Sequence, residues 1–191
     1  TEGVNLAHRY LRMRARPKIL LCTNYEEAWS YFQKYGENIL GIISDFDFLR
    51  NGVQDPRAGL KFAKNVKSQL SDIPILLQSN LQSNEQKAFD IGASFVLKDS
   101  PVLLQEVRQF MTQYFSFGDF IFRTPDGTEV ARAPDLKSLE EQLHTVPEES
   151  LWYHGERNHF SNWLKARTEF WLAHRLRPRK VSEYPSASAL R

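Results

Sequence analysis

The run Ile73-Pro74-Ile75-Leu76-Leu77-Gln78, which is followed by Ser79-Asn80, decides the predicted fold. An apolar run with so few polar interruptions is typical of a strand that is buried on both faces of a parallel sheet. Three further runs have this character and alternate with helical patterns, namely Lys18–Cys22, Ile39–Ser44 and Phe95–Leu97. The sequence therefore predicts an α/β fold, a doubly wound parallel sheet with helices on both faces and right-handed crossovers.

The segments between these runs have apolar residues at helical spacing. Tyr25–Tyr35 and Ala58–Leu70 each repeat apolar side chains every three or four positions. Glu85–Ile91 is short and is followed by Gly92, a common helix terminator. Pro101 opens the last helix of this series, which extends to Tyr114.

A different pattern follows the strand–helix alternation. Asp119–Arg123 and Thr128–Arg132 are predicted strands on either side of the turn Thr124-Pro125-Asp126-Gly127. Asp135 is expected to cap a helix, and a second helix is predicted from Ser161 to Pro178. We therefore expect a small α+β extension after the parallel sheet.

Composition indicates a globular protein without a strong charge imbalance. The 191 residues carry a formal net charge of +2 and are 41% apolar, and the sequence pI is about 8.6. This balance predicts neither nucleic-acid nor membrane binding, and no apolar stretch approaches the roughly 18 residues of a membrane span. The single cysteine, Cys22, lies in an apolar run, which favours a reducing compartment and a cytoplasmic location.

Polar side chains follow three of the predicted strands. Ser44-Asp45 with Asp47, then Ser79-Asn80, then Lys98-Asp99 stand where the strands end. Ligands bind beyond the carboxyl ends of the strands in open α/β sheets. A carboxylate that can attack a phosphoryl group, a hydroxyl that can hydrogen-bond it and an ammonium that offsets its charge suit transient acyl-phosphate chemistry. The alternative interpretation is that each residue marks the point where a strand meets water.

These segments resemble a known family. Ile42-Ile43-Ser44-Asp45, Ile75-Leu76-Leu77-Gln78-Ser79-Asn80 and Ala93-Ser94-Phe95-Val96-Leu97-Lys98 resemble strands three, four and five of the receiver domain of two-component response regulators, which has a flavodoxin-like fold. The resemblance implies that Asp45 is the phosphoacceptor, Ser79 the switch hydroxyl, Phe95 the switch aromatic and Lys98 the conserved lysine. It also implies Mg²⁺ bound by Asp45 and the backbone carbonyl of Asp47, and a histidine kinase or small phosphodonor as partner.

The chain departs from the receiver pattern beside this site. The stretch Phe46–Ala58 before Gly59 is longer than the usual loop, which predicts an insertion. Lys98 is followed by Asp99-Ser100-Pro101, so the proline that usually comes directly after the lysine is displaced.

A receiver also has an acidic pair at the end of its first strand, whereas Lys18–Cys22 ends in Thr23-Asn24. Either the chain is a degenerate receiver without its metal, or Lys18–Cys22 is strand two and strand one lies upstream. The single helix before Asp45 favours the second interpretation, with Val4–Arg14 as the remainder of helix one. The remaining acidic ligands would then lie outside this chain, Mg²⁺ would bind weakly or not at all, and an open sheet edge would permit a homodimer.

A second resemblance concerns the extension. Phe117-Gly118-Asp119-Phe120 and Ser161-Asn162-Trp163-Leu164 resemble the region that joins a receiver to a phosphoenolpyruvate synthase or pyruvate phosphate dikinase-like module. This resemblance implies a PEP/pyruvate-binding effector module further along the same chain. We therefore expect a receiver-like domain at residues 1–115, incomplete at its N-terminus, an extension at 116–180 and a linker at 181–191.

The segment at residues 151–175 has two further features. His154 and His159 are five positions apart, a spacing that does not favour two metal ligands on one helix face. The aromatic side chains in this segment are predicted to form a core or a docking face; they are Trp152, Phe160, Trp163, Phe170 and Trp171.

The leading functional hypothesis is a receiver-type regulatory domain in phosphorelay signal transduction, which accepts phosphate on Asp45 and controls a downstream nucleotide-dependent enzyme. The alternative is a receiver-shaped protein-interaction scaffold that is never phosphorylated. An independent enzyme has little support, because the sequence has no glycine-rich phosphate loop and no nucleophile elbow motif.

Overall fold

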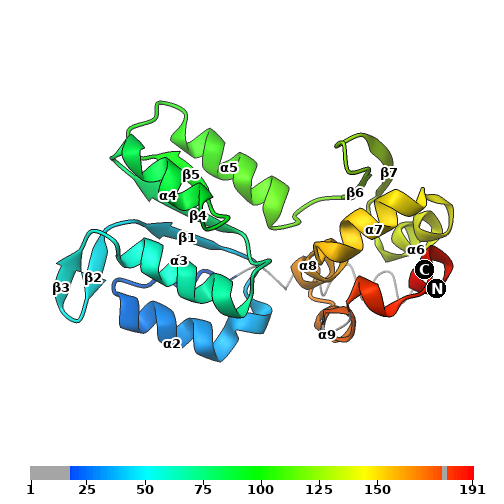
Figure 1. Ribbon diagram of the computed structural model, residues 1–191, viewed down its shortest axis with the longest axis horizontal. Helices are drawn as coiled ribbons and strands as arrows, with labels where there is room; N and C mark the ends of the chain where they lie inside the picture. Colours follow the sequence, from blue (N-terminus) through cyan, green and yellow to red (C-terminus); the bar gives the residue numbers. More distant parts are fainter. Residues whose placement is uncertain (1–17, 178–179) are drawn as a thin grey trace. The chain divides into compact units, whose positions relative to one another are not determined.

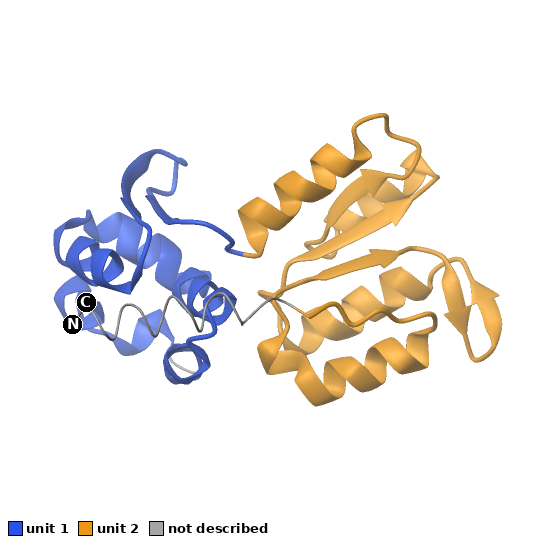
Figure 2. Ribbon diagram, turned by 180° about the vertical axis from the view of Figure 1, so that it is seen from behind, with its two compact units in different colours: residues 1–17, 116–191 blue, residues 18–115 orange. Residues whose placement is uncertain are grey.

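Residues 18–177 and 180–191 are described by the computed structural model. The predicted remainder of helix one, at residues 4–14, lies outside the described residues. Figure 2 divides the chain into two units. Of the described residues, 18–115 form unit 2, and 116–177 with 180–191 belong to unit 1.

Unit 2 is built on a three-stranded sheet in the order β1-β4-β5. The strands are β1 (Ile42–Asp45), β4 (Ile75–Ser79) and β5 (Ser94–Leu97). Both neighbouring pairs, β1 with β4 and β4 with β5, are parallel. The prediction of a parallel sheet is therefore confirmed for three of the four apolar runs.

The central strand β4 is buried on both faces. Ile75 and Leu77 belong to a core cluster with apolar side chains of helices α2 (Tyr25–Tyr35) and α3 (Ala58–Gln69). Leu76 alternates to the opposite face and is 1% exposed. Helix α5 (Leu103–Tyr114) contacts β5, and Figure 1 shows it on the other side of the sheet from α2 and α3.

The prediction of a fourth strand is wrong. Lys18–Cys22 forms no strand, and Ile19 and Leu21 are 89% and 80% exposed. The first pairing nearby is a single parallel bridge between Asn24 and Leu49. An apolar run indicates a tendency to be buried, but a strand also needs a neighbour for its backbone hydrogen bonds, and no described strand pairs with this run.

The predicted insertion is a β-hairpin. Strands β2 (Phe48–Arg50) and β3 (Val53–Asp55) pair antiparallel. Asn51 and Gly52 join them with φ angles of 52° and 75°. Positive φ at both central residues of a two-residue turn is the requirement of a type I′ turn, for which Asn-Gly is a preferred sequence.

The helices of unit 2 begin close to their predicted starts. The Asn24 side chain caps α2 by accepting a hydrogen bond from Glu27 N at 2.9 Å. Helix α4 (Glu85–Phe89) is short, and Gly92 after it has a φ of 68°. Helix α5 begins two residues after Pro101, which lies in the preceding turn. Two short 3₁₀ helices, η1 (Gly36–Asn38) and η2 (Gln82–Asn84), complete the unit.

Unit 1 consists of an antiparallel hairpin and several helices. The predicted hairpin is present as β6 (Phe120–Arg123) and β7 (Glu129–Ala133), with Gly127 in its turn at a φ of 92°. Asp135 caps α6 (Leu136–Thr145), as predicted, by accepting a hydrogen bond from Ser138 N at 2.8 Å.

The later part of unit 1 differs from the prediction. Helix α7 (Glu148–Glu156) was not predicted, and the single helix expected from residue 161 to 178 is two helices, α8 (His159–Ala166) and α9 (Phe170–Leu176). Thr168 lies between them with a φ of 65°, a left-handed conformation that ends a helix.

The tail that was expected to be a linker contains η3 (Val181–Glu183) and α10 (Ala187–Leu190). Ala187 is 2% exposed in the core of unit 1 because it packs with the apolar side chains of this unit. Among residues 18–177 and 180–191, no helix has the length and apolar character needed to cross a membrane.

Candidate functional site

The strand register brings three of the predicted site residues to one edge of the sheet. Asp45 at the end of β1 is opposite Gln78, and Ser79 is the next residue of β4. Ser79 in turn is opposite Leu97, and Lys98 follows, with its backbone N–H donating to Ser79 O at 2.9 Å. Because the strands are parallel, all three residues lie at the carboxyl edge, where α/β sheets bind ligands.

Asp45 and Lys98 form an ion pair at this edge. Lys98 Nζ donates to Asp45 Oδ2 at 2.8 Å, and the two side chains are 33% and 37% exposed respectively. The Oδ1 atom of Asp45 has no hydrogen-bond partner within the described part of the chain. An ion pair with this exposure contributes about 0–1 kcal/mol, so the lysine can move to another anionic group at little cost.

Gly59 holds the start of α3 against the backbone of Asp45. Its N–H donates to Phe46 O at 3.0 Å. A Cβ atom at this position would lie 1.9 Å from Asp45 O and 3.0 Å from Phe46 Cα. A glycine is therefore required here for the close approach, and the contact fixes the backbone that carries the Asp45 carboxylate.

Ser79 is 7% exposed and its hydroxyl oxygen is an acceptor. It accepts hydrogen bonds from Leu81 N at 3.1 Å and from Asn84 Nδ2 at 3.0 Å. Sequence reasoning missed Asn84, because an asparagine at the start of a helix is usually a cap. Ser79, Asn84 and Lys98 line one small pocket, together with Phe46, Asp47, Pro56, Gln78, Asn80 and Leu81.

Phe95, the residue predicted as the switch aromatic, packs against the core of unit 2. It is opposite Leu77 in the sheet. Its ring makes an edge contact with the ring of Phe46, with centroids 6.3 Å apart. Phe95 therefore supports the residue that follows Asp45.

The resemblance assigns Mg²⁺ to Asp45 and to the backbone carbonyl of Asp47, and the side chains of both residues have partners. Asp45 pairs with Lys98, and Asp47 Oδ1 accepts a hydrogen bond from Gln54 Nε2 at 2.6 Å. Across residues 18–177 and 180–191, no group of three or more histidine, cysteine or acidic side chains could hold a metal ion. Magnesium binding by Asp45 and the backbone carbonyl of Asp47 stays a prediction.

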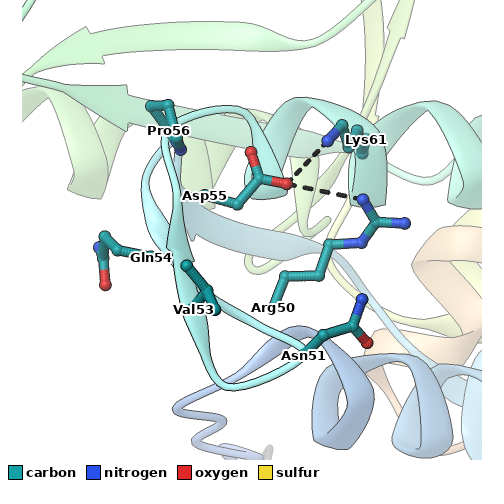
Figure 3. A pocket seen from close by; sticks show the side chains of 7 residues that line it. All are labelled: Arg50, Asn51, Val53, Gln54, Asp55, Pro56 and Lys61. Carbon is teal, nitrogen blue, oxygen red and sulfur yellow. Dashed lines mark hydrogen bonds and ion pairs between the residues drawn. The ribbon is translucent and has the colours of Figure 1, made fainter.

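The hairpin insertion has its own polar cluster, which sequence reasoning also missed (Figure 3). Asp55 lies 2.7 Å from Lys61 Nζ and 3.6 Å from Arg50 Nη1. The hydrogen bonds from Lys61 and from the backbone N–H of Arg57 lower the pKa of Asp55. The Arg50 guanidinium also lies over the ring of Tyr25, 5.1 Å from its centroid. These contacts attach the hairpin to α2 and α3, and they account for the cluster as structural.

The two histidines of unit 1 are brought together by the fold. His154 Nδ1 and His159 Nδ1 lie 2.9 Å apart, and His154 Nε2 accepts a hydrogen bond from Arg123 N at 2.7 Å. The neutral His154 ring therefore carries its proton on Nδ1. A metal at Nδ1 would move this proton to Nε2, against the Arg123 N–H, so the geometry favours a hydrogen-bonded pair.

Burial dominates the environment of His154. The residue is 4% exposed. Its pKa is lowered from 6.5 to about 3, first by burial and then by the charges of His159, Arg123 and Arg157. His154 therefore stays neutral at physiological pH and joins α7 to β6.

The aromatic side chains of unit 1 divide between core and surface. Trp163 is 1% exposed, and Trp152 and Phe160 pack against the same core. Trp171 and Phe170 are 67% and 38% exposed. The prediction of a core is therefore confirmed for Trp152, Phe160 and Trp163, and a docking face at Phe170 and Trp171 stays a prediction.

Comparisons of the chain with protein-family models, with curated proteins and with solved structures found no significant match.

Proposed function

We propose that this chain is a receiver-type regulatory domain of a phosphorelay and that Asp45 accepts the phosphoryl group. The observation that carries the proposal is the grouping of Asp45, Lys98 and Ser79 at the carboxyl edge of a parallel sheet. A carboxylate, an ammonium and a hydroxyl in this arrangement supply a nucleophile, a counter-charge and a hydrogen-bond donor for one phosphoryl group.

The reaction would use the Asp45 carboxylate oxygen that does not pair with Lys98. Asp45 Oδ1 attacks the phosphorus atom of the donor and forms an acyl-phosphate P–O bond. The bond from phosphorus to the leaving group breaks at the same centre, and the leaving group departs with that electron pair. With a phosphohistidine donor the leaving group is the imidazole, and with acetyl phosphate it is acetate.

The neighbouring groups stabilise the product. Lys98 lies 2.8 Å from Oδ2 and can follow the added charge to a phosphoryl oxygen. Ser79 already accepts two hydrogen bonds, so its own proton is the part of the hydroxyl that can contact a phosphoryl oxygen. These two contacts would distinguish the phosphorylated state from the free state.

One observation favours the alternative of a scaffold that is never phosphorylated. Asp45 Oδ2 is paired with Lys98 and Asp47 Oδ1 with Gln54, so neither carboxylate has both of its oxygens available to a metal ion that would align a phosphodonor. A protein that works by contact alone requires no free carboxylate. On either alternative we propose a nucleotide-dependent effector module of the same chain as a partner. A phosphorylated domain would also require a histidine kinase or a small phosphodonor.

The deciding experiment measures phosphorylation of the full chain by intact mass. The chain is incubated with acetyl phosphate and magnesium chloride, beside the Asp45→Asn variant and the Asp47→Asn variant. We expect a slow gain of one phosphoryl group that Asp45→Asn abolishes and Asp47→Asn does not abolish. No gain in the unmodified chain, or an equal gain in Asp45→Asn, would refute phosphorylation at Asp45 and favour the scaffold.

A further inference from the structure

A hydrogen-bonded chain of three side chains ends at the Ser79 hydroxyl. Lys87 Nζ of α4 donates to Asn84 Oδ1 at 2.8 Å. Asn84 Nδ2 then donates to Ser79 Oγ at 3.0 Å. Lys87 is exposed, whereas Asn84 and Ser79 are each 7% exposed, so the bond between these two side chains is made in a largely dry environment. Such bonds are costly to leave unmade.

The hydrogen bonds from Lys87 to Asn84 and from Asn84 to Ser79 run in one direction, because an ammonium group can only donate. Lys87 therefore requires the oxygen of the Asn84 amide on its side, and the amide NH₂ group faces Ser79. If the amide turned over, its NH₂ would face the ammonium and its oxygen would face the hydroxyl. Ser79 would then donate its proton to Asn84 instead of to the pocket.

Asn84 does not have the role that its position suggests. It is the N-cap residue of α4, yet its side chain makes no capping hydrogen bond. A buried asparagine that gives up the cap and bonds a serine instead indicates that the serine contact is the constrained one. Together with Leu81 N, Asn84 fills both acceptor positions of the Ser79 oxygen.

We propose that Asn84 and Lys87 are positioning residues that hold Ser79 as a hydrogen-bond donor toward the pocket it shares with Lys98. The group that receives this proton would be an anionic oxygen or fluoride atom bound at Asp45, a consequence that rests on the proposed function. Lys87 acts at a distance in this arrangement, because it orients the Asn84 amide and never contacts the bound anion.

The first test examines the orientation itself, without any ligand. NMR of the full chain can follow hydrogen exchange of the Asn84 side-chain NH₂ group. We expect protection in the unmodified chain, and loss of protection in Lys87→Met, which keeps the alkyl stem but cannot donate. Lys64→Met on α3 is the control, since Lys64 is exposed. Protection that survives Lys87→Met unchanged would overturn the proposed role of Lys87.

The second test uses beryllofluoride, an analogue of a phosphoryl group, with magnesium chloride and ¹⁹F NMR detection. Ser79→Ala should weaken binding about tenfold, since hydrogen bonds to charged groups contribute about this much. Asn84→Asp, which turns the donor into an acceptor, should weaken binding similarly in the unmodified background and cause no further loss in Ser79→Ala.

The outcomes of the second test separate the two proposals. An equal loss from Asn84→Asp in both backgrounds would mean that its charge acts directly, and would overturn positioning through Ser79. If the unmodified chain and Asp45→Asn both fail to bind beryllofluoride, the proposed function is refuted. The orientation of Asn84 is then decided by the exchange measurement alone.

Discussion

Gly59→Ala tests the contact that fixes the Asp45 backbone. The added Cβ would lie 1.9 Å from Asp45 O, 2.9 Å from Asp45 C and 3.0 Å from Phe46 Cα. All three neighbours are backbone atoms that cannot rotate away, so we take the upper end of the cost of overpacking, about 3 kcal/mol. Alanine returns about 1 kcal/mol through its higher helix propensity. The expected net loss is about 2 kcal/mol in the free energy of unfolding of unit 2.

The matched control is Gly36→Ala at the end of α2. There the nearest atom to the added Cβ is a ring carbon of Phe32 at 3.4 Å, an ordinary contact. We expect its free energy of unfolding to stay within about 0.5 kcal/mol of the unmodified chain. Urea unfolding followed by hydrogen-exchange mass spectrometry of β1 and β4 peptides reports on unit 2 separately. Equal stabilities of the two variants would refute the close contact between α3 and Asp45.

Three further predictions concern both units. His154 has a pKa of about 3 in the folded protein, below its ordinary value of 6.5. Its contribution to the free energy of unfolding is therefore complete above pH 6.5 and decreases by about 1.4 kcal/mol per pH unit as the pH falls from 6.5 toward 3. His154→Gln should remove this slope from acid-unfolding curves, whereas the exposed control His144→Gln should leave it unchanged. Thr168→Gly should raise the free energy of unfolding of unit 1 by up to about 1 kcal/mol, because glycine adopts a positive φ without the Cβ penalty; a lower midpoint in urea would contradict this. Lys98→Met should reduce the lifetime of the phosphoryl group on Asp45, measured by intact mass after removal of acetyl phosphate, and an unchanged lifetime would exclude a contact of Lys98 with the product.

The apolar runs of the sequence are enough to predict β1, β4 and β5, the three strands that pair in the sheet of unit 2. β4 was recognisable because its apolar side chains on both faces meet β1, β5 and the helices, as a run without alternation predicts. Lys18–Cys22 has a similar apolar composition but pairs with no strand of residues 18–177 and 180–191, and composition alone does not reveal whether a partner strand exists. The β2–β3 hairpin is also predictable from sequence, because Asn51-Gly52 is a strong signal for a two-residue hairpin turn.

The sequence predicts the residues of the candidate site that follow the strands, but not the residues that contact them. Asp45, Ser79 and Lys98 follow apolar runs, so their positions come from the strand pattern. Asn84 could not be assigned in this way, because its contact with Ser79 depends on the path of the η2 turn. Likewise, the contact of Gln54 with Asp47 depends on how the hairpin folds back, and sequence spacing alone does not give it.

The hairpin insertion is compatible with the candidate site because it begins and ends at the same place. The insertion begins at Phe46, directly after β1, and ends before Gly59 in the first turn of α3, and one hydrogen bond of 3.0 Å joins these two residues. Loop-closure entropy costs only about 0.6 kcal/mol for each doubling of loop length, so a longer connection there is a small burden. The hairpin nevertheless contacts the connection after β1, where Gln54 donates to Asp47 Oδ1, while Lys98 pairs with Oδ2 of Asp45 and not with Oδ1. The insertion therefore provides a partner for the Asp47 carboxylate and not for the Asp45 carboxylate, which would carry the phosphoryl group. Phosphorylation of Asp45 and the contact at Asp47 can for this reason be tested separately.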